Sequence, residues 1–165
     1  MTNNSLQESD KKELARSFNS TVDKLYRNLV ANADGENIIV GTKDKPIVTN
    51  SDKLPIEHFF MDSVYIRKMT MYEETVVVGA IHKHLHICFL LSGHITVSSK
   101  EGTAEYKAPC HIVATPGIQR VLYAHEDSVW YNIHKNPTST EDISQLEEEI
   151  VVTTQKDYEE YIKNK

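Results

Sequence analysis

Three of the chain's eight histidines, His82, His84 and His86, lie at alternate positions in one short stretch. Successive side chains of a β-strand point to opposite faces, so in an extended chain these imidazoles share one face with Cys88. The other face is almost wholly apolar and needs a cover; it carries Ile81, Lys83, Leu85, Ile87, Phe89 and Leu91. If both faces are covered, the imidazoles point into an enclosed space, where buried polar groups need partners. We therefore expect a metal, a ligand or ordinary hydrogen bonds at this face.

Composition limits the classes of protein that remain. The 165 residues suit one domain, and 39% hydrophobic and 25% charged residues are typical of a soluble globular protein. A net charge of −6 argues against a nucleic-acid partner but leaves room for a small anionic ligand. Cys88 and Cys110 fit no zinc spacing, so we expect reduced thiols. No apolar run approaches the ~20 residues that span a bilayer, and the polar N-terminus lacks a signal-peptide core. We expect no membrane partner and a cytoplasmic location.

The pattern along the chain predicts a β-rich body with a helix before it and short helices after it. Apolar residues at three- and four-residue steps predict a helix over residues 5–32, and residues 36–62 read as short edge strands and loops. The strands expected after that are Val64–Met71, Thr75–Leu91 (one strand, or two joined by a bend at Gly79), His94–Ser99, Thr103–Lys107, Cys110–Thr115, Arg120–Ala124 and Ser128–His134. Strands at this spacing indicate a sandwich or barrel.

Two short helices are expected at the C-terminal end. Thr140 is the predicted cap of the first, and the second follows Thr154. We therefore divide the chain into an N-terminal helical extension (1–35), a β-barrel (36–137) and a C-terminal helical cover (138–165), all within a single domain.

Residues from about 56 to 134 resemble the cupin superfamily of double-sheet barrels. The first cupin motif has two histidines one residue apart, an acid four residues later and a glycine seven residues further; here His82, His86 and Gly93 fall on its second histidine, acid and glycine. The second motif is a Pro/Gly turn followed by a histidine; here Pro116-Gly117 is that turn and Arg120 takes the histidine position.

More narrowly, the chain is similar to small cupin-like proteins of bacteriophage genomes, which implies the host cytoplasm as its location. The stretches that carry this resemblance are Ile56–Phe60, Val64–Arg67, His82–His86, Pro116–Arg120 and Val129–His134. The resemblance implies an all-β, cupin-type double-stranded β-helix (jelly-roll) barrel.

The departures from the cupin pattern change the expected metal site. Ala80 and Arg120 stand at two usual ligand positions, so we expect His82, His84 and His86 to hold a divalent metal, with Fe, Zn, Mn and Ni not distinguished. Alternate residues on a straight strand lie ~6.6 Å apart, which makes three ligands from one strand awkward. Two of the three, joined by His125 or His134 after folding, form an easier site.

Arg120 points to a second kind of site. A guanidinium in the barrel beside imidazoles binds carboxylate or phosphate, and Trp130 or His134 would contact a bound ring or sugar. The ordinary alternative is a salt bridge from Arg120 to Glu57, Glu105 or Glu126.

The leading functional hypothesis is a divalent-metal-dependent enzyme acting on a small anionic or sugar-like molecule. Arg120 would orient the substrate, and Tyr123 or His125 is the candidate acid or base. The alternatives are a metal-free protein that binds a sugar, sugar phosphate or nucleotide, including capture of a host signal, and a structural phage-associated module with a filled barrel. The apolar face of the histidine stretch also predicts a homodimer, unless the N-terminal helix covers that face.

Overall fold

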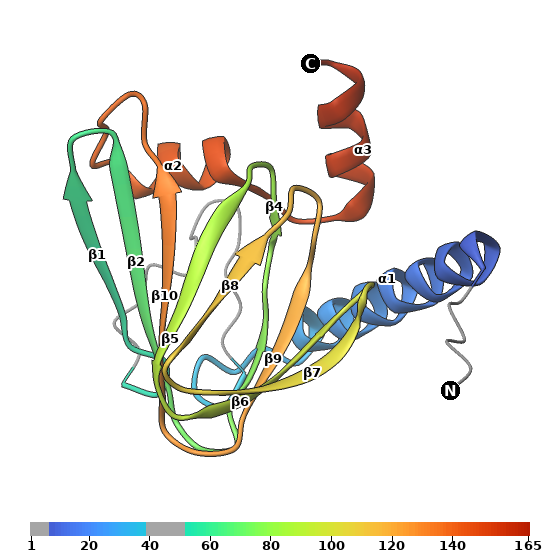
Figure 1. Ribbon diagram of the computed structural model, residues 1–165, viewed down its shortest axis with the longest axis horizontal. Coiled ribbons are helices and arrows are strands. Elements are labelled where there is room, and N and C mark those ends of the chain that lie inside the picture. Colours follow the sequence, from blue (N-terminus) through green and yellow to red (C-terminus); the bar gives the residue numbers. More distant parts are fainter. Residues whose placement is uncertain (1–6, 39–51) are drawn as a thin grey trace, which may run out of the picture.

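The computed structural model describes residues 7–38 and 52–165 (Figure 1). Three helices lie in these ranges: α1 (Glu8–Ala31), α2 (Ile143–Ile150) and α3 (Gln155–Lys163). The strands are β1 (Ile56–Met61), β2 (Val64–Met71), β3 (Val76–Val78), β4 (Ile81–His82), β5 (His86–Ser92), β6 (His94–Ser99), β7 (Gly102–Lys107), β8 (Cys110–Ala114), β9 (Arg120–Ala124), β10 (Ser128–Lys135) and β11 (Val151–Val152). The predicted edge strands within 39–51 lie outside the described residues.

Two antiparallel sheets form the body of the protein. One has the strand order β1-β2-β10-β5-β8 and the other β3-β9-β6-β7, while β4 pairs with β11 alone. Between β5 and β10 the chain crosses repeatedly from one sheet to the other, because β5, β8 and β10 belong to the first and β6, β7 and β9 to the second. This alternation is that of a jelly-roll barrel. The predicted fold class, an all-β jelly roll with an N-terminal helix and short C-terminal helices, is confirmed.

The core lies between the inner faces of the two sheets. Period-two alternation turns Cys88 and Leu90 of β5 and Trp130 of β10 inward, where each is at most 3% exposed. From the opposite sheet, Ile95 and Leu122 pack into the same cluster. Burial of these side chains stabilises the barrel and fixes the strand register, because a shift of one residue would turn the apolar set to solvent.

The long predicted strand Thr75–Leu91 is divided in the structure. It forms β3, β4 and β5, and residues 83–85 between β4 and β5 lie in a bend. The strand is also interrupted at Gly79 and Ala80, and the Gly79 amide donates to the carbonyl of Arg120 at 2.9 Å. The second interruption, after His82, is the one that shapes the site described below.

The C-terminal helices differ from expectation at one cap. Asp142, not the predicted Thr140, caps α2, since its carboxylate accepts from the amides of Ser144 and Gln145. The cap of α3 is Thr154, as predicted, in a reciprocal pair with Asp157.

Helix α1 runs away from the barrel, and its N-terminal half stands clear of the sheets (Figure 1). Val22 is buried, whereas Leu14 is 53% exposed. In the described part of the chain, no helix combines the length and the apolar character needed to cross a membrane.

Candidate metal centre

Strands β5 and β10 bring two histidines face to face. Their antiparallel register pairs Asn132 with Cys88 and Ile133 with Ile87. The next residues along, His134 and His86, therefore meet across the ladder, and both point inward because they continue the buried alternation of their strands. Each is 6% exposed, and their ring centroids are 4.5 Å apart.

The third histidine, His82, comes from the separate strand β4. Its backbone is held by pairing with Val151 of β11 and by the Gly117 amide, which donates to the His82 carbonyl at 2.8 Å. Because the chain bends over residues 83–85, His82 and His86 are not successive positions on one straight strand. Their ring centroids lie 4.1 Å apart, well inside the ~6.6 Å step between alternate residues of a strand.

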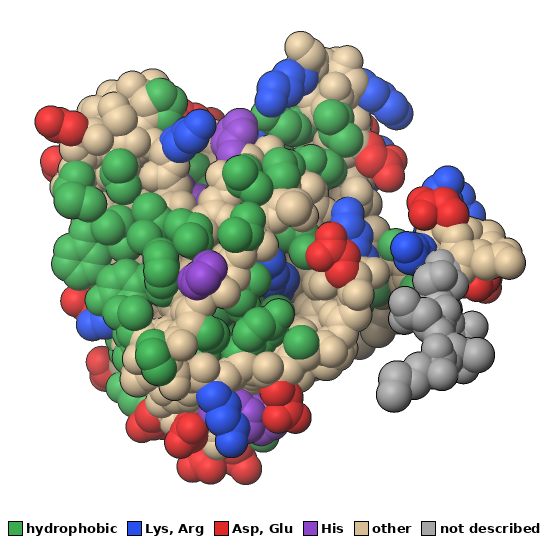
Figure 2. All heavy atoms as spheres, viewed as in Figure 1, with side chains coloured by type: hydrophobic (Ala, Val, Ile, Leu, Met, Phe, Trp, Pro, Cys, Tyr) green, Lys and Arg blue, Asp and Glu red, His purple; other side chains and the backbone are tan. Residues whose placement is uncertain are grey.

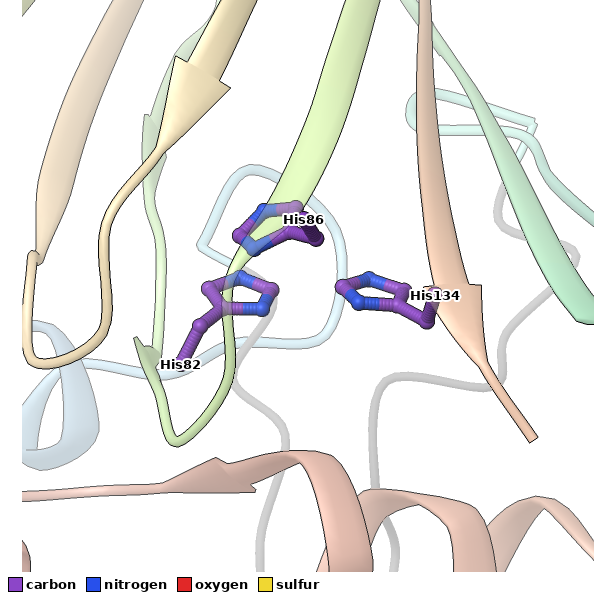
Figure 3. A group of neighbouring side chains, drawn as sticks. All are labelled: His82, His86 and His134. Atoms are coloured by element: carbon purple, nitrogen blue, oxygen red, sulfur yellow. The ribbon is translucent and has the colours of Figure 1, made fainter. Parts of the chain in front are cut away.

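His82, His86 and His134 therefore converge from three strands on one point (Figure 3). Each offers a ring nitrogen, and these three atoms lie within 4.8 Å of one another. This is the spacing of ligands around a common ion, since zinc–imidazole bonds are ~2.0–2.1 Å long.

Burial keeps all three imidazoles in the neutral, ligating form. It is the main cause that lowers the pKa of His86 to about 4 and that of His134 to about 3. The pKa of His82 is also held well below its usual range, first by burial and then by the neighbouring His86 and His134. A neutral imidazole is the form that binds a metal ion.

The hydrogen bonds around the triad leave nitrogens available. The Nδ1 of His82 is buried without a hydrogen-bond partner. The Nδ1 of His86 donates to the carbonyl of His84 at 3.3 Å, which fixes the tautomer and leaves Nε2 as an acceptor. The residues present therefore fit a metal ion better than a network of hydrogen-bonded core histidines.

The structure does not bring His84 into this group. Its side chain is exposed in the bend between β4 and β5, where its ring meets the edge of Tyr161 at 6.3 Å. His134, which the sequence placed as a substrate contact or an additional ligand, takes the third position instead.

Tyr123 and His125 also lie away from the triad, on the outer side of the four-stranded sheet. Tyr123 is 36% exposed and meets the ring of His125 edge-on. The Nε2 of His125 is 2.6 Å from the hydroxyl of Thr96, and its ring stacks on His94. Neither residue lines the barrel cavity, so neither is placed to act as the acid or base that the sequence predicted.

A partly open cavity of about 770 Å³ lies next to the triad, between the barrel and the helices α1 and α2. His82, His86, Trp130 and Arg120 line it, so both Arg120 and Trp130 lie where the sequence placed them. The alternative of a structural module with a filled barrel stays a prediction.

Arg120 has no carboxylate partner among residues 7–38 and 52–165. Its guanidinium donates to the carbonyl of Val113 at 3.2 Å and lies 3.8 Å from the sulfur of Cys88. None of the three acids that the sequence offered pairs with Arg120. Glu57 pairs with Lys68 and Glu105 with His94, and Glu126 forms no ion pair with Arg120. Arg120 therefore lines the cavity without an ion pair to a described acid, although Glu147, Glu148 and Asp157 also line that cavity.

Sequence reasoning missed a second arginine, Arg67 of β2. It also lines the cavity, and it forms an ion pair at 3.2 Å with Glu147 of α2. Its charge contributes to the low pKa of both His82 and His134. The available signal was its inward position in the alternating strand Val64–Met71.

Neither the protein-family models nor the curated proteins compared with this chain gave a match. Solved structures similar to it include cupins. An RmlC-like cupin from Shewanella frigidimarina is 11% identical with a TM-score of 0.47, over 58% of this chain and 84% of that one. An HTH_3 family transcriptional regulator from Vibrio cholerae is 19% identical with a TM-score of 0.46, over 54% of this chain and 55% of that one.

A salicylate 1,2-dioxygenase from Pseudaminobacter salicylatoxidans is 9% identical with a TM-score of 0.49, over 72% of this chain and 34% of that one. This chain thus spans about half of the regulator and about a third of the dioxygenase. Because none of these TM-scores reaches 0.5, the jelly-roll assignment rests on the strand pairing itself. The narrower resemblance to phage proteins stays a prediction.

Proposed function

We propose that this protein binds a divalent metal ion through His82, His86 and His134 and acts as a metal-dependent enzyme on a small anionic molecule. The observation that supports this most directly is the convergence of three neutral ring nitrogens within 4.8 Å. An all-imidazole ligand set suits Zn, Fe and Ni better than Mn, which prefers carboxylate oxygen. A metal with three protein ligands and open positions supplies Lewis-acid chemistry or activates a small bound molecule.

Arg120 supplies the preference for an anion. Its guanidinium lines the same cavity as the triad, and it is held there by its bonds to Val113 and Cys88. A guanidinium binds a carboxylate or phosphate through two parallel hydrogen bonds, and such charge-assisted bonds are roughly twice as strong as bonds between neutral groups. The Arg120 side chain would therefore fix one end of the substrate and direct the other towards the histidines.

Trp130 and Asn132, which also line the cavity, would orient the rest of the substrate. Asn132 accepts from the indole of Trp130 at 2.9 Å and from the thiol of Cys88 at 3.1 Å, so these groups are fixed relative to one another. Trp130 offers a rigid aromatic wall for a ring or sugar. Burial raises the pKa of Cys88 to about 12, so this thiol stays protonated and serves as a packing group and weak donor.

The decisive experiment is elemental analysis of protein purified without chelator and reloaded with Fe, Zn, Ni or Mn. We expect about one metal ion per chain in the wild type and none in the His82→Ala/His86→Ala variant. If the wild-type protein binds none of these metals, the proposal of a metal-dependent enzyme is wrong.

A metal-free binding protein for a small anion is the second candidate, and Arg120 favours it independently of the histidines. Binding of an anionic ligand that is unchanged by chelator treatment and lost in Arg120→Ala would select this function instead. Screening carboxylic acids and sugar phosphates by thermal shift, with and without metal, separates the two.

We also propose a homodimer formed through the outer face of the five-stranded sheet. The strand registers align one apolar residue from each strand in a single row across this face: Phe59, Ile66, Ile133, Ile87 and Val113. Figure 2 shows apolar side chains gathered over β1, β2 and β10. Phe59 is 42% exposed and Val113 54%, at the two ends of the row.

A second copy of the chain suits this face for two reasons. Helix α1 runs away from the barrel, so it does not supply the cover that the sequence left open (Figure 1). Beside the apolar row lies an ion pair of Lys68 with Glu57, which gives the face both signs of charge. An apolar row with charges of both signs beside it suits pairing with its own copy about a two-fold axis.

A further inference from the structure

A second hollow, of about 310 Å³, lies outside the barrel. Its walls come from the bend at residues 83–85, from the end of β10, from Pro116 and from α3. None of the three clustered histidines lines it, whereas His84, which the bend turns away from them, does. This hollow is therefore distinct from the candidate metal centre.

The hollow is cationic in a chain that is acidic overall. Lys83, Lys135, Lys165 and His84 line it, and no Asp or Glu does, although the net charge of the chain is −6. Figure 2 shows basic and histidine side chains at this end of the molecule, beside α3. Like charges gathered around a concave surface attract an oppositely charged ligand more strongly than scattered lysines do.

Two tyrosines of α3 form an aromatic wall. The ring centroids of Tyr158 and Tyr161 are 6.1 Å apart. Tyr158 is fixed against the turn at Gly117: a Cβ at this glycine, whose φ is +78°, would lie 2.4 Å from the tyrosine ring. This tight contact and the capped start of α3 together fix the position of the aromatic wall relative to the barrel.

Two ammonium groups lie over the Tyr161 ring. The Nζ of Lys83 is 5.1 Å from its centroid and that of Lys165 is 5.8 Å away. Lys83 also donates to the carbonyl of Glu148. These contacts place both ammonium groups at the aromatic wall, where an anionic group of a ligand can pair with them.

We propose that this hollow binds a small phosphomonoester that carries a planar ring. A dianionic phosphate matches the three ammonium groups and the imidazole, and a ring matches Tyr158 and Tyr161. The volume admits a molecule of this size but not a macromolecule. The proposal needs no metal and stands apart from the proposed function.

Isothermal titration with phenyl phosphate, the simplest molecule with both groups, tests the site. We expect saturable binding at one site per chain, with phenol and inorganic phosphate each binding at least about tenfold more weakly. Lys135→Glu and Tyr161→Ala should each weaken phenyl phosphate about tenfold or more. The Lys163→Glu variant, on the same helix but outside the hollow, is the matched charge control and should bind like the wild type.

The Arg120→Ala variant separates this hollow from the barrel cavity. Unchanged binding in it supports the proposal, and loss of binding places the phosphate in the barrel and overturns it. Absence of saturation in the wild type up to about 10 mM, or unchanged affinity in Lys135→Glu, also overturns it. Lys135 is exposed, so its substitution keeps the test valid even if Tyr161→Ala does not fold.

Discussion

His86 and His134 lie opposite each other at the end of the ladder between β5 and β10, with their ring centroids 4.5 Å apart. They are separated by 48 residues in the sequence but by a single strand spacing in the barrel. Metal affinity at the proposed centre thus depends on a strand pairing as well as on the motif that contains His82 and His86.

His134→Ala should remove metal affinity, whereas His84→Ala should not. His134 supplies one of the three convergent nitrogens, and His84 points to solvent. We expect the metal affinity of His134→Ala to fall by at least about 100-fold. Substitution of a residue that only hydrogen-bonds to a metal ligand already lowers the affinity about 10–100-fold. Competition with a chelator of known affinity measures both. Equal losses in the two variants would contradict the assignment of the third ligand.

The chelator-treated protein should lose stability as the pH falls from about 6.5 towards 4. The folded state holds the pKa of His86 at about 4 and that of His134 at about 3, below the usual 6.5, so in this window the unfolded chain binds more protons. The contribution of these imidazoles to the free energy of unfolding is therefore complete above pH 6.5. Below that pH it declines by up to about 1.4 kcal/mol per pH unit for each imidazole. Urea unfolding between pH 4 and 8 measures this slope, and His134→Asn should reduce it. An unchanged slope in the variant would count against burial as the cause.

Arg120→Lys should weaken the binding of a carboxylate or phosphate ligand in the barrel by about tenfold. Lysine keeps the charge but loses the planar fork that makes two parallel hydrogen bonds. Arg120→Ala should weaken binding further, because it removes the charge as well. Titration of each variant with the ligand found by thermal shift measures this order. Equal affinity of all three proteins would show that the anion binds elsewhere.

Ile87→Asp should convert the proposed dimer into a monomer. Ile87 lies within the apolar row, between Ile133 and Val113, and a carboxylate there would be buried in a two-fold interface without a partner. Sedimentation equilibrium at a common concentration measures the mass of each variant. Leu14→Asp, on the exposed part of α1, should stay dimeric; if it alone dissociates, the helix and not the sheet joins the copies.

Leu90→Ala should destabilise the protein by about 2–5 kcal/mol, because it leaves a cavity in the core. The neighbouring Leu91→Ala removes the same atoms from a side chain that is 53% exposed, against 0% for Leu90. We expect it to cost less than about 1 kcal/mol in the isolated chain, since little apolar surface is re-exposed. Urea unfolding of both variants measures the difference. Comparable losses would contradict the inward register of β5.

The fold class and most strands were predictable because they depend on local alternation and turn residues. Val64–Met71, His94–Ser99 and Arg120–Ala124 appear with the expected bounds. The cap of α2 was misplaced because Thr140 and Asp142 are both good cap residues. Only the local backbone decides between them, and in the structure the hydroxyl of Thr140 accepts from the amide of Asp142 instead.

The triad was only partly predictable, for a different physical reason. Alternation places His82, His84 and His86 on one face only while the strand is straight, and the bend over residues 83–85 breaks that condition. No local pattern states where a strand bends. The pairing of β5 with β10 is a long-range contact, but the inward series Trp130, Asn132, His134 did carry a signal that His134 continues into the barrel.

The pairing of β4 with β11 makes a distant segment of the chain part of the support of the candidate metal centre. Val151 lies 69 residues after His82 in the sequence, yet it pairs with His82 and holds its backbone. His86 and His134 do not depend on β11, because they belong to strands of the five-stranded sheet. Shortening the chain before Val151 would therefore keep all three histidines and leave His82 without its strand partner.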